Sequence, residues 1–378
     1  MEYRTLGRTG ARISAISLGT EYIQDANQER MSAVIDAALE RGANYLDAWY
    51  AEPTFRDRLG VALRERRDNI LISGHLGATH QNGQYVRTRD PDLAEKFVLD
   101  YLERLQTDHV DVLFLHNCDE SEDLDAILAP GGLADRALAM QRAGRTRWIG
   151  FSGHTPATAQ RAVETGIVDV LMFPLNLTGH AAPGKAELLA ACSRTNAGLV
   201  AMKPFAGGML FQPEPTLQAN RFVSGGREAT LHRREPVAAA TCLAYVLAHD
   251  EVSTVVPGCA TVEEVAEDLG LWDAPAKERD FSRVLASFAT YEPGHCVYCN
   301  HCLPCPAGID IAAVNRLLDR ALVHGMDDAL EERYRSLQPN ADDCLACGDC
   351  EERCPFGVAA VERMDRAREL FAQATPAR

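Results

Sequence analysis

Eight of the twelve cysteines lie in two short runs near the end of the chain. The runs are Cys296-x2-Cys299-x2-Cys302-x2-Cys305-Pro306 and Cys344-x2-Cys347-x2-Cys350-x3-Cys354-Pro355. The second has the spacing at which three thiolates hold one iron–sulfur cubane and the fourth reaches another. The first is one residue shorter before its fourth cysteine. Structural zinc instead uses pairs of C-x2-C separated by a loop. The two runs therefore predict two [4Fe–4S] clusters.

We expect each cluster to take its fourth cysteine from the other run. The predicted ligand sets are Cys296, Cys299, Cys302 with Cys354, and Cys344, Cys347, Cys350 with Cys305. Two roles stay open for these clusters. They could transfer electrons, which would require a flavin or a redox partner protein to divide an electron pair. They could instead stabilise a tail with a small core, since metal binding contributes folding free energy.

A second group of chemically capable residues lies in the first 290 residues, where polar side chains follow short apolar runs. Asp47, His75 and His116 come at or directly after such runs, and Glu52 follows Asp47 by five residues. Carboxylates and imidazoles are the usual groups of acid/base catalysis. The same four side chains would also suit a divalent metal, which is the less expected use.

The elements that position these residues alternate between apolar runs and segments of helical periodicity. Helical patterns occupy residues 28–42, 92–105 and 235–249, among others. Eight such alternations predict a (β/α)8 TIM barrel over residues 1–290, whose active site lies at the carboxyl ends of the strands. No G-x-G-x-x-G follows the first strand, which disfavours an open dinucleotide-binding sheet. The expected strands are 13–19, 44–47, 70–75, 110–116, 148–152, 168–173, 199–202 and 252–256.

The remaining residues, 291–378, form a predicted iron–sulfur domain. Between the cysteine runs, segments 312–325 and 327–337 have helical patterns, so an α-helical ferredoxin-like domain is expected.

Composition narrows the class of protein. The formal charge is 38 − 54 = −16, which disfavours nucleic acid and anionic membranes as partners. Neither a signal peptide nor a long apolar span is evident. We expect a soluble cytoplasmic protein that acts on a small molecule.

Several segments together resemble the aldo-keto reductase superfamily, in the branch with a C-terminal iron–sulfur domain. YRTLGRTGARISAISLGT, LDAWYAEPTFRDRLGVAL, HVDVLFLHN, GFSGH, AMKPFAGGML and VVPGCATVEEVAEDL match its motifs in order, from about residue 2 to 270. The resemblance implies a barrel that binds NAD(P)H without a Rossmann fold. It also implies hydride transfer to a carbonyl and a catalytic tetrad of Asp, Tyr, Lys and His.

Two members of that tetrad differ here. Asp47 and His116 match the family's Asp and His, whereas Glu52 and His75 stand at the Tyr and Lys positions. A carboxylic acid donates a proton near neutral pH only if burial or a like charge raises its pKa. We therefore expect a protonated Glu52, with His75 and His116, as a non-standard acid/base set.

The resemblance also assigns a nicotinamide site. Ser152 is kept, whereas the neighbouring ring contacts fall at Gly153, Met172 and Met202. Glu264 stands where a cation commonly meets a 2′-phosphate, so NAD(H) is expected rather than NADP(H). The full predicted set is Gly19, Thr20, Ser152, Lys203, Pro204, Pro257, Gly258, Glu264, Glu267 and Asp268.

The predicted activity is reduction of a small polar carbonyl, or oxidation of the alcohol, in a sugar-like compound. A lyase, dehydratase or epimerase on the same barrel, and an electron-relay or binding protein, are the alternatives. Basic residues in the loop 211–234 hint at an anionic substrate, although a solvated loop is the simpler explanation.

Overall fold

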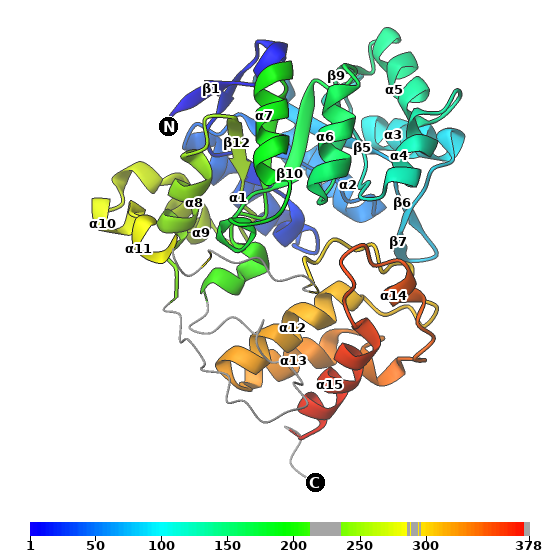
Figure 1. Cartoon of the computed structure of the whole chain (residues 1–378), viewed down its shortest axis with the longest axis vertical. Coiled ribbons are helices and arrows are strands. Elements are labelled where there is room, and N and C mark those ends of the chain that lie inside the picture. The colour runs from blue at the N-terminus through cyan, green and yellow to red at the C-terminus, as the bar shows by residue number, and fades with distance from the viewer. Residues whose placement is uncertain (212–235, 286–287, 289–293, 295, 374–378) are drawn as a thin grey trace. The chain divides into compact units, whose positions relative to one another are not determined.

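The computed structural model describes residues 1–211, 236–285, 288, 294 and 296–373. These residues form two compact units (Figure 1). The first comprises residues 1–204 and 239–289, and the second comprises residues 205–238 and 290–378. Residues 205–211 and 236–238, which sequence analysis placed in the barrel, thus group with the cysteine-rich tail. Most of the loop 211–234, with its basic residues, lies outside the described residues.

The first unit contains the predicted parallel barrel. Its strands follow the order β12-β11-β10-β9-β8-β5-β4-β3, and bridges from Ile16 to Val255 and from Gly19 to Gly258 join the two ends. The eight expected apolar runs correspond to the eight strands, which confirms the fold class. The strands are β3 (Leu18–Gly19), β4 (Tyr45–Asp47), β5 (Leu71–Leu76), β8 (Val110–Leu115), β9 (Thr146–Ser152), β10 (Val170–Pro174), β11 (Gly198–Met202) and β12 (Val252–Val256).

Helices surround this sheet, and local sequence signals explain where several begin. Asn27 and Asp90 cap the first and third of these helices by accepting hydrogen bonds from backbone amides of the first turn. Proline is the first residue of three helices, at positions 53, 91 and 156. The helices are α1 (Gln28–Glu40), α2 (Pro53–Leu63), α3 (Pro91–Leu105), α4 (Ser121–Leu128), α5 (Leu133–Arg142), α6 (Pro156–Glu164), α7 (Lys185–Thr195), α8 (Ala239–Leu247), α9 (Val262–Leu269), α10 (Ala276–Arg279) and α11 (Ser282–Leu285).

Two hairpins extend the barrel. The first, β1 (Tyr3–Thr5) with β2 (Arg12–Ser14), precedes the first barrel strand. The second, β6 (Ala78–Gln81) with β7 (Gln84–Arg87), follows β5 and was not predicted from the sequence. Asn82 and Gly83 form its turn with φ values of 53° and 80°. Positive φ at both positions defines the type I′ turn that Asn-Gly favours, so the signal was present and overlooked.

The barrel interior is filled by apolar side chains from opposite strands. Tyr45, Phe114, Val170, Met172 and Val200 are almost fully buried and belong to one cluster. A filled interior leaves the strand ends as the place for polar side chains, as barrels of this type require.

The second unit is helical in its described part. Its helices are α12 (Ile311–His324), α13 (Asp328–Ser336), α14 (Asp349–Glu352) and α15 (Ala360–Gln373), preceded by a 3-10 segment at Ala206–Phe211. Asp310 and Asp327 cap α12 and α13, near the beginnings expected from the sequence. The core includes Val314, Leu318 and Met364, and the rings of Tyr334 and Phe371 stack with centroids 3.9 Å apart.

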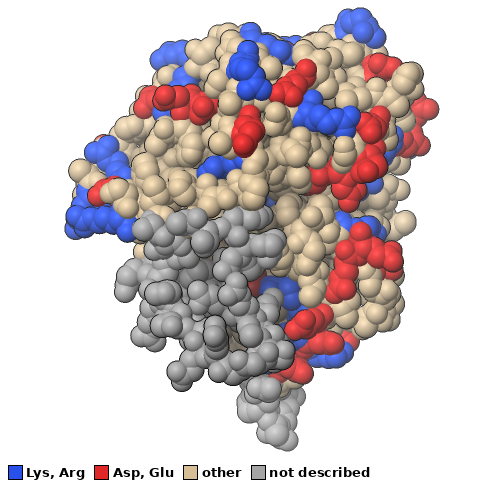
Figure 2. Space-filling view, in the orientation of Figure 1, with Lys and Arg blue, Asp and Glu red and all other residues tan. Residues whose placement is uncertain are grey.

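Acidic and basic side chains are interspersed on the face shown in Figure 2. Within the described ranges, no helix is both long enough and apolar enough to cross a membrane.

Candidate active site and cluster-binding cysteines

Three predicted catalytic residues meet at the ends of neighbouring strands. Asp47 is the last residue of β4, His75 lies near the end of β5, and His116 directly follows β8. His75 Nε2 lies 3.0 Å from Asp47 Oδ1, and His75 Nδ1 lies 2.9 Å from His116 Nδ1. All three residues are buried. They form one continuous hydrogen-bonded chain.

A tyrosine that sequence analysis did not select extends this chain. Tyr85 Oη lies 2.9 Å from His116 Nε2 and 3.5 Å from Asn117 Nδ2. Tyr85 belongs to β7, so the overlooked hairpin carries it to the strand ends. The Asn-Gly turn could have predicted the hairpin, but no local pattern pairs Tyr85 with a histidine 31 residues away.

Surrounding groups hold the chain in place. Ser73 Oγ donates to Asp47 Oδ1 over 2.6 Å and accepts a hydrogen bond from the Ala48 amide. The Trp49 ring stacks on His116 at 13° with centroids 6.1 Å apart, and it meets Tyr85 edge-on at 5.3 Å. One indole therefore orients both the imidazole and the phenol.

The contacts determine a direction for the hydrogen bonds. A carboxylate only accepts, so His75 Nε2 carries the hydrogen that faces Asp47. A neutral His75 then accepts at Nδ1 from His116 Nδ1–H, and His116 Nε2 accepts from the Tyr85 hydroxyl. The uncharged chain thus donates stepwise from Tyr85 to Asp47.

Glu52 lies outside this chain, at the start of α2. Its carboxylate accepts a hydrogen bond from the Phe55 amide over 2.7 Å and caps the helix. Partial burial raises the pKa of Glu52, but hydrogen bonds from Thr54 and Phe55 outweigh burial and lower the pKa below its usual value. The structure contradicts the expectation of a raised pKa, because a helix N-terminus stabilises the ionised form.

The same geometry bears on the metal hypothesis. His75 and His116 direct their Nδ1 atoms at each other, and Glu52 directs its carboxylate at backbone amides. These four predicted side chains therefore do not present their donor atoms to one point.

The predicted cofactor residues near the barrel ends are mainly held by backbone contacts. The Gly19 amide donates to the Pro257 carbonyl, and Thr20 Oγ1 donates to the Asp47 carbonyl over 2.8 Å. A Cβ atom on Gly258 would come within 2.3 Å of the ring of Tyr22, an exposed side chain that would have to move. A Cβ atom on Gly19 would lie 3.1 Å from the Val256 carbonyl oxygen, and such close backbone packing suits a turn against a diphosphate.

Ser152 and Lys203 lie at the ends of β9 and β11. Ser152 Oγ accepts from the Asn117 amide over 2.9 Å, which leaves its own hydrogen to donate. Lys203 has a φ of 54°, and its carbonyl accepts from Asn176 Nδ2. Pro204, the next residue, is buried.

Charges of both signs lie at the start of α9. The Glu264 carboxylate accepts from the Ala260 amide over 2.5 Å, and Arg30 Nε donates to the Ala260 carbonyl over 2.7 Å. Sequence analysis did not identify Arg30, which comes from α1. Glu264 therefore lies at the N-terminus of α9, where its charge was expected to repel a 2′-phosphate. The positive charge of Arg30 lies nearby and opposes that repulsion.

Asp268 and Glu267 lie further along α9. Asp268 is buried and accepts a hydrogen bond from Cys259 Sγ at 3.3 Å. Burial raises the pKa of Asp268 to about 7. Its side chain thus has a partner within the barrel wall, whereas Glu267 is exposed.

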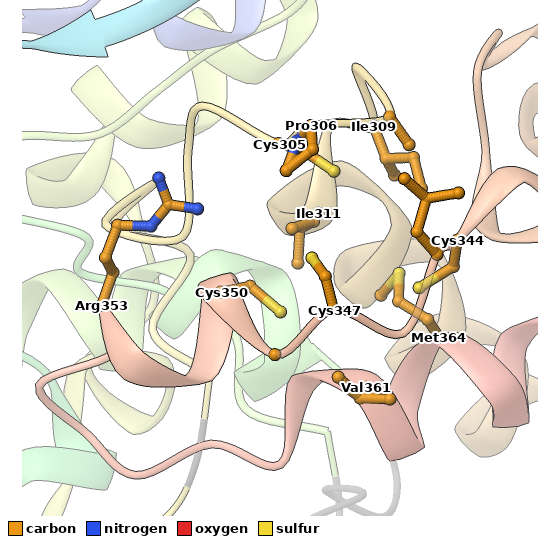
Figure 3. Close-up of a pocket in the computed structure, with 13 residues that line it drawn as sticks. Cys305, Pro306, Ile309, Ile311, Cys344, Cys347, Cys350, Arg353, Val361 and Met364 are labelled. Atoms are coloured by element: carbon orange, nitrogen blue, oxygen red, sulfur yellow. The ribbon is translucent and has the colours of Figure 1, made fainter.

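Four cysteines in the second unit line one cavity (Figure 3). Cys344, Cys347 and Cys350 come from the second run, and Cys305 comes from the first. This is the arrangement that the crossed ligand assignment requires. The other lining residues are mostly apolar, and they include Ile309, Ile311, Val361 and Met364. Four thiols in an apolar cavity fit a [4Fe–4S] cluster.

The first cysteine run is anchored by polar contacts to two helices. Tyr298 Oη donates to Asp319 of α12 over 2.6 Å, and Arg363 of α15 pairs with the same carboxylate. Asn315 Nδ2 lies 3.6 Å from Cys296 Sγ. Burial, followed by the nearby Cys296 and Cys299, raises the pKa of Cys302, so these three thiols are close enough to interact.

Comparison with known proteins agrees with both units. Residues 15–287 match the aldo/keto reductase family, and residues 295–359 match the 4Fe-4S dicluster domain. L-Galactose dehydrogenase of Arabidopsis thaliana is 27% identical over 286 residues, covering 71% of this chain and 87% of that protein. L-Glyceraldehyde 3-phosphate reductase of Escherichia coli is 23% identical over 309 residues, covering 71% and 87%.

A solved structure supports the fold. The holo form of an aldo-keto reductase from Bacillus halodurans has a TM-score of 0.62 and 22% identity, covering 77% of this chain and 98% of that one. The family match spans well over half of the chain and coincides with the barrel whose strand ends carry Asp47, His75 and His116. The chain therefore belongs to the aldo/keto reductase family, with a 4Fe-4S dicluster domain following the barrel.

Proposed function

We propose that this protein is an NAD(H)-linked oxidoreductase that interconverts a small, sugar-like carbonyl compound and its alcohol. The carrying observation is the buried chain Asp47–His75–His116 at the strand ends of an aldo/keto reductase barrel. Hydrogen-bonded imidazoles are suited to moving a proton to or from a carbonyl oxygen. Carbonyl reduction needs this proton transfer in addition to the transfer of a hydride.

The relatives support the substrate class. Their names specify L-galactose and L-glyceraldehyde 3-phosphate, both of which are sugars or sugar phosphates. Members of this family bind nicotinamide cofactors, and a reduced nicotinamide supplies a hydride when bound. We therefore infer that this chain acts on a polyhydroxylated aldehyde, or on its cyclic form.

The residues for the cofactor are those around Gly19, Gly258 and the N-terminus of α9. Their tight backbone packing and the helix amides suit a diphosphate. The pair of Glu264 and Arg30 bears on the choice of cofactor. Glu264 disfavours a 2′-phosphate, and Arg30 weakens that effect while it remains bonded to the Ala260 carbonyl. On this basis we favour NAD(H), with Ser152 and Lys203 nearer the nicotinamide end.

For the tail we propose two [4Fe–4S] clusters. Cys305, Cys344, Cys347 and Cys350 would hold one, as the shared cavity supports. Cys296, Cys299, Cys302 and Cys354 would hold the other. Electron transfer would need a flavin or a redox partner, because a hydride carries two electrons and a cubane exchanges one. A structural role requires neither.

The test uses anaerobically purified full-length protein with L-galactose plus NAD⁺, and with DL-glyceraldehyde plus NADH or NADPH. Absorbance at 340 nm should rise with L-galactose plus NAD⁺ and fall with DL-glyceraldehyde plus the reduced cofactor. Calorimetry should show tighter binding of NADH than of NADPH. Tighter NADPH binding would contradict the cofactor preference. Absence of any nicotinamide binding would contradict the oxidoreductase and favour a lyase, dehydratase or epimerase on the same barrel.

A further inference from the structure

We propose that Tyr85 is the catalytic residue that gives a proton to the substrate's carbonyl oxygen, and that Asp47, His75 and His116 position and reload it. This inference rests on the proposed function, because it requires that the barrel reduce a carbonyl. It assigns the chemistry to a hairpin residue that sequence analysis did not select.

The other polar groups at the strand ends are poorly suited to be the donor. Asp47 accepts hydrogen bonds from Ser73 and His75, so it has no hydrogen to give. Glu52 caps α2, and its lowered pKa keeps it ionised at neutral pH. His75 is engaged at both ring nitrogens. Tyr85 carries a hydroxyl hydrogen, which it gives to His116 Nε2 in the uncharged arrangement and can give to the substrate once His116 holds an extra proton.

Contacts from several elements fix the position of Tyr85. The phenol oxygen contacts His116 Nε2 at 2.9 Å, and the ring packs edge-on to Trp49 at 89°. Tyr85 is 4% exposed, so its phenol is shielded from bulk water. A hairpin with Asn-Gly at its turn fixes the register, which pairs Tyr85 with His80.

A cation also lies near the phenol. Arg89 interacts electrostatically with Tyr85 while it donates to the backbone carbonyls of His116 and Asn117 over 2.8 and 2.9 Å. Asp123 pairs with Arg89 and offsets part of its charge. A phenol ordinarily titrates near pH 10, and a nearby positive charge stabilises the phenolate that donation leaves behind.

The hydrogen-bonded residues can supply and replace the proton that Tyr85 donates. When the imidazoles hold one extra proton, His116 donates from both ring nitrogens, and the Tyr85 hydroxyl hydrogen is released from His116 and can face the substrate. The Tyr85 O–H bond then breaks as an O–H bond forms on the carbonyl oxygen. The phenolate takes the proton of His116 Nε2, which restores the uncharged chain of this structure. Solvent returns the extra proton before the next turnover.

The experiment compares Tyr85→Phe with Tyr3→Phe as a matched control. Tyr3 also lies in the first unit and donates its hydroxyl hydrogen to the Gly42 carbonyl over 2.9 Å. With DL-glyceraldehyde and NADH in single turnover, Tyr85→Phe should react about 10²- to 10⁴-fold more slowly, and Tyr3→Phe as fast as wild type. Affinity for NADH, followed by nicotinamide fluorescence, should be the same in all three proteins.

A second readout is independent of turnover. In protein labelled with ¹⁵N-histidine, Tyr85→Phe should shift the His116 Nε2 resonance, because that nitrogen loses its hydrogen-bond donor. An unchanged resonance would overturn the proposed chain. If Tyr85→Phe fails to fold, 3-fluorotyrosine at position 85 keeps the shape and lowers the pKa of the phenol. The pH profile of the turnover rate should then move to lower pH, and an unmoved profile would overturn the proposal.

The outcomes separate the two proposals. An active wild type with an equal or faster Tyr85→Phe would refute the role of Tyr85, and the proposed function would stand. A wild type that binds NADH but reduces none of the tested carbonyls would count against the function, and with it against the donor role.

Discussion

The barrel mouth and the cysteine-rich tail encode their chemistry in different ways. In the tail, eight or nine residues separate the first and last thiols of a run, so the spacing itself predicts the ligands. At the barrel mouth, Asp47, His75, Tyr85 and His116 come from separate elements, and the contact between the last two spans 31 residues. Local spacing identifies a metal site, whereas a proton-transfer chain is visible only after folding.

The largest expected effect concerns the tail. Because metal binding contributes directly to folding, we expect iron removal to unfold the helices of the second unit while the barrel persists. Circular dichroism should show partial loss of helix, and limited proteolysis should leave a barrel fragment. A tail that keeps its helices without iron would show that its apolar core suffices.

The crossed ligand assignment sharpens the same point. Intact protein should contain about eight iron atoms and eight acid-labile sulfides per chain. Cys305→Ala and Cys347→Ala should each fall to about four and leave the same residual cluster by electron paramagnetic resonance. Cys192→Ala, outside both runs, is the control. Different residual clusters in the two variants would refute the shared cavity as a ligand set.

At the barrel mouth, Asp47→Asn should reverse the hydrogen-bond direction. An amide can donate to His75 Nε2, which would favour the opposite tautomer of both imidazoles. We expect turnover to fall about 10²- to 10⁴-fold with little change in folding, because without the Asp47 charge the imidazoles no longer hold the extra proton that reloads Tyr85. The ¹⁵N resonances of His75 and His116 should exchange protonated and unprotonated character. Unchanged resonances would contradict the assigned direction.

A smaller effect is expected at the α9 turn. Replacing Glu264 with Gln removes a negative charge and keeps the hydrogen-bond acceptor for the Ala260 amide. NADPH affinity should rise about tenfold or less, because Arg30 already offsets the charge, and NADH affinity should change little. Calorimetric titration with both cofactors measures this. Glu263→Gln, one residue earlier in the same turn, controls for a general change of charge.

The smallest expected effect concerns Glu52, despite its place in the motif. Glu52→Gln should lower stability by about 0.5–1 kcal/mol through a weaker helix cap and should leave turnover nearly unchanged. Because its folded pKa is lowered, Glu52 stabilises the fold above its unfolded pKa, and that contribution is lost as pH falls through the folded pKa. The difference between wild type and variant in denaturant unfolding should therefore shrink in acid. A large loss of turnover would restore Glu52 to the mechanism.

The sequence alone determined the features that depend on near neighbours. Alternating apolar runs identified all eight barrel strands, because burial in a parallel sheet selects continuous β-branched and apolar segments. The cysteine spacing marked the cluster domain, and the segments beginning near Asp310 and Asp327 were recognisable as helices. The residues that end neighbouring strands were also identified, since parallel strands bring their carboxyl ends to one rim.

Only the tertiary structure decided which of those residues act on one another. Glu52 occupies a motif position, yet the start of α2 turns its carboxylate to backbone amides. Tyr85 occupies none, yet the β6–β7 hairpin brings its hydroxyl to His116. Hydrogen bonds depend on distances of a few tenths of an ångström and on side-chain direction. Those quantities are set by the packing of distant segments, which no local pattern records.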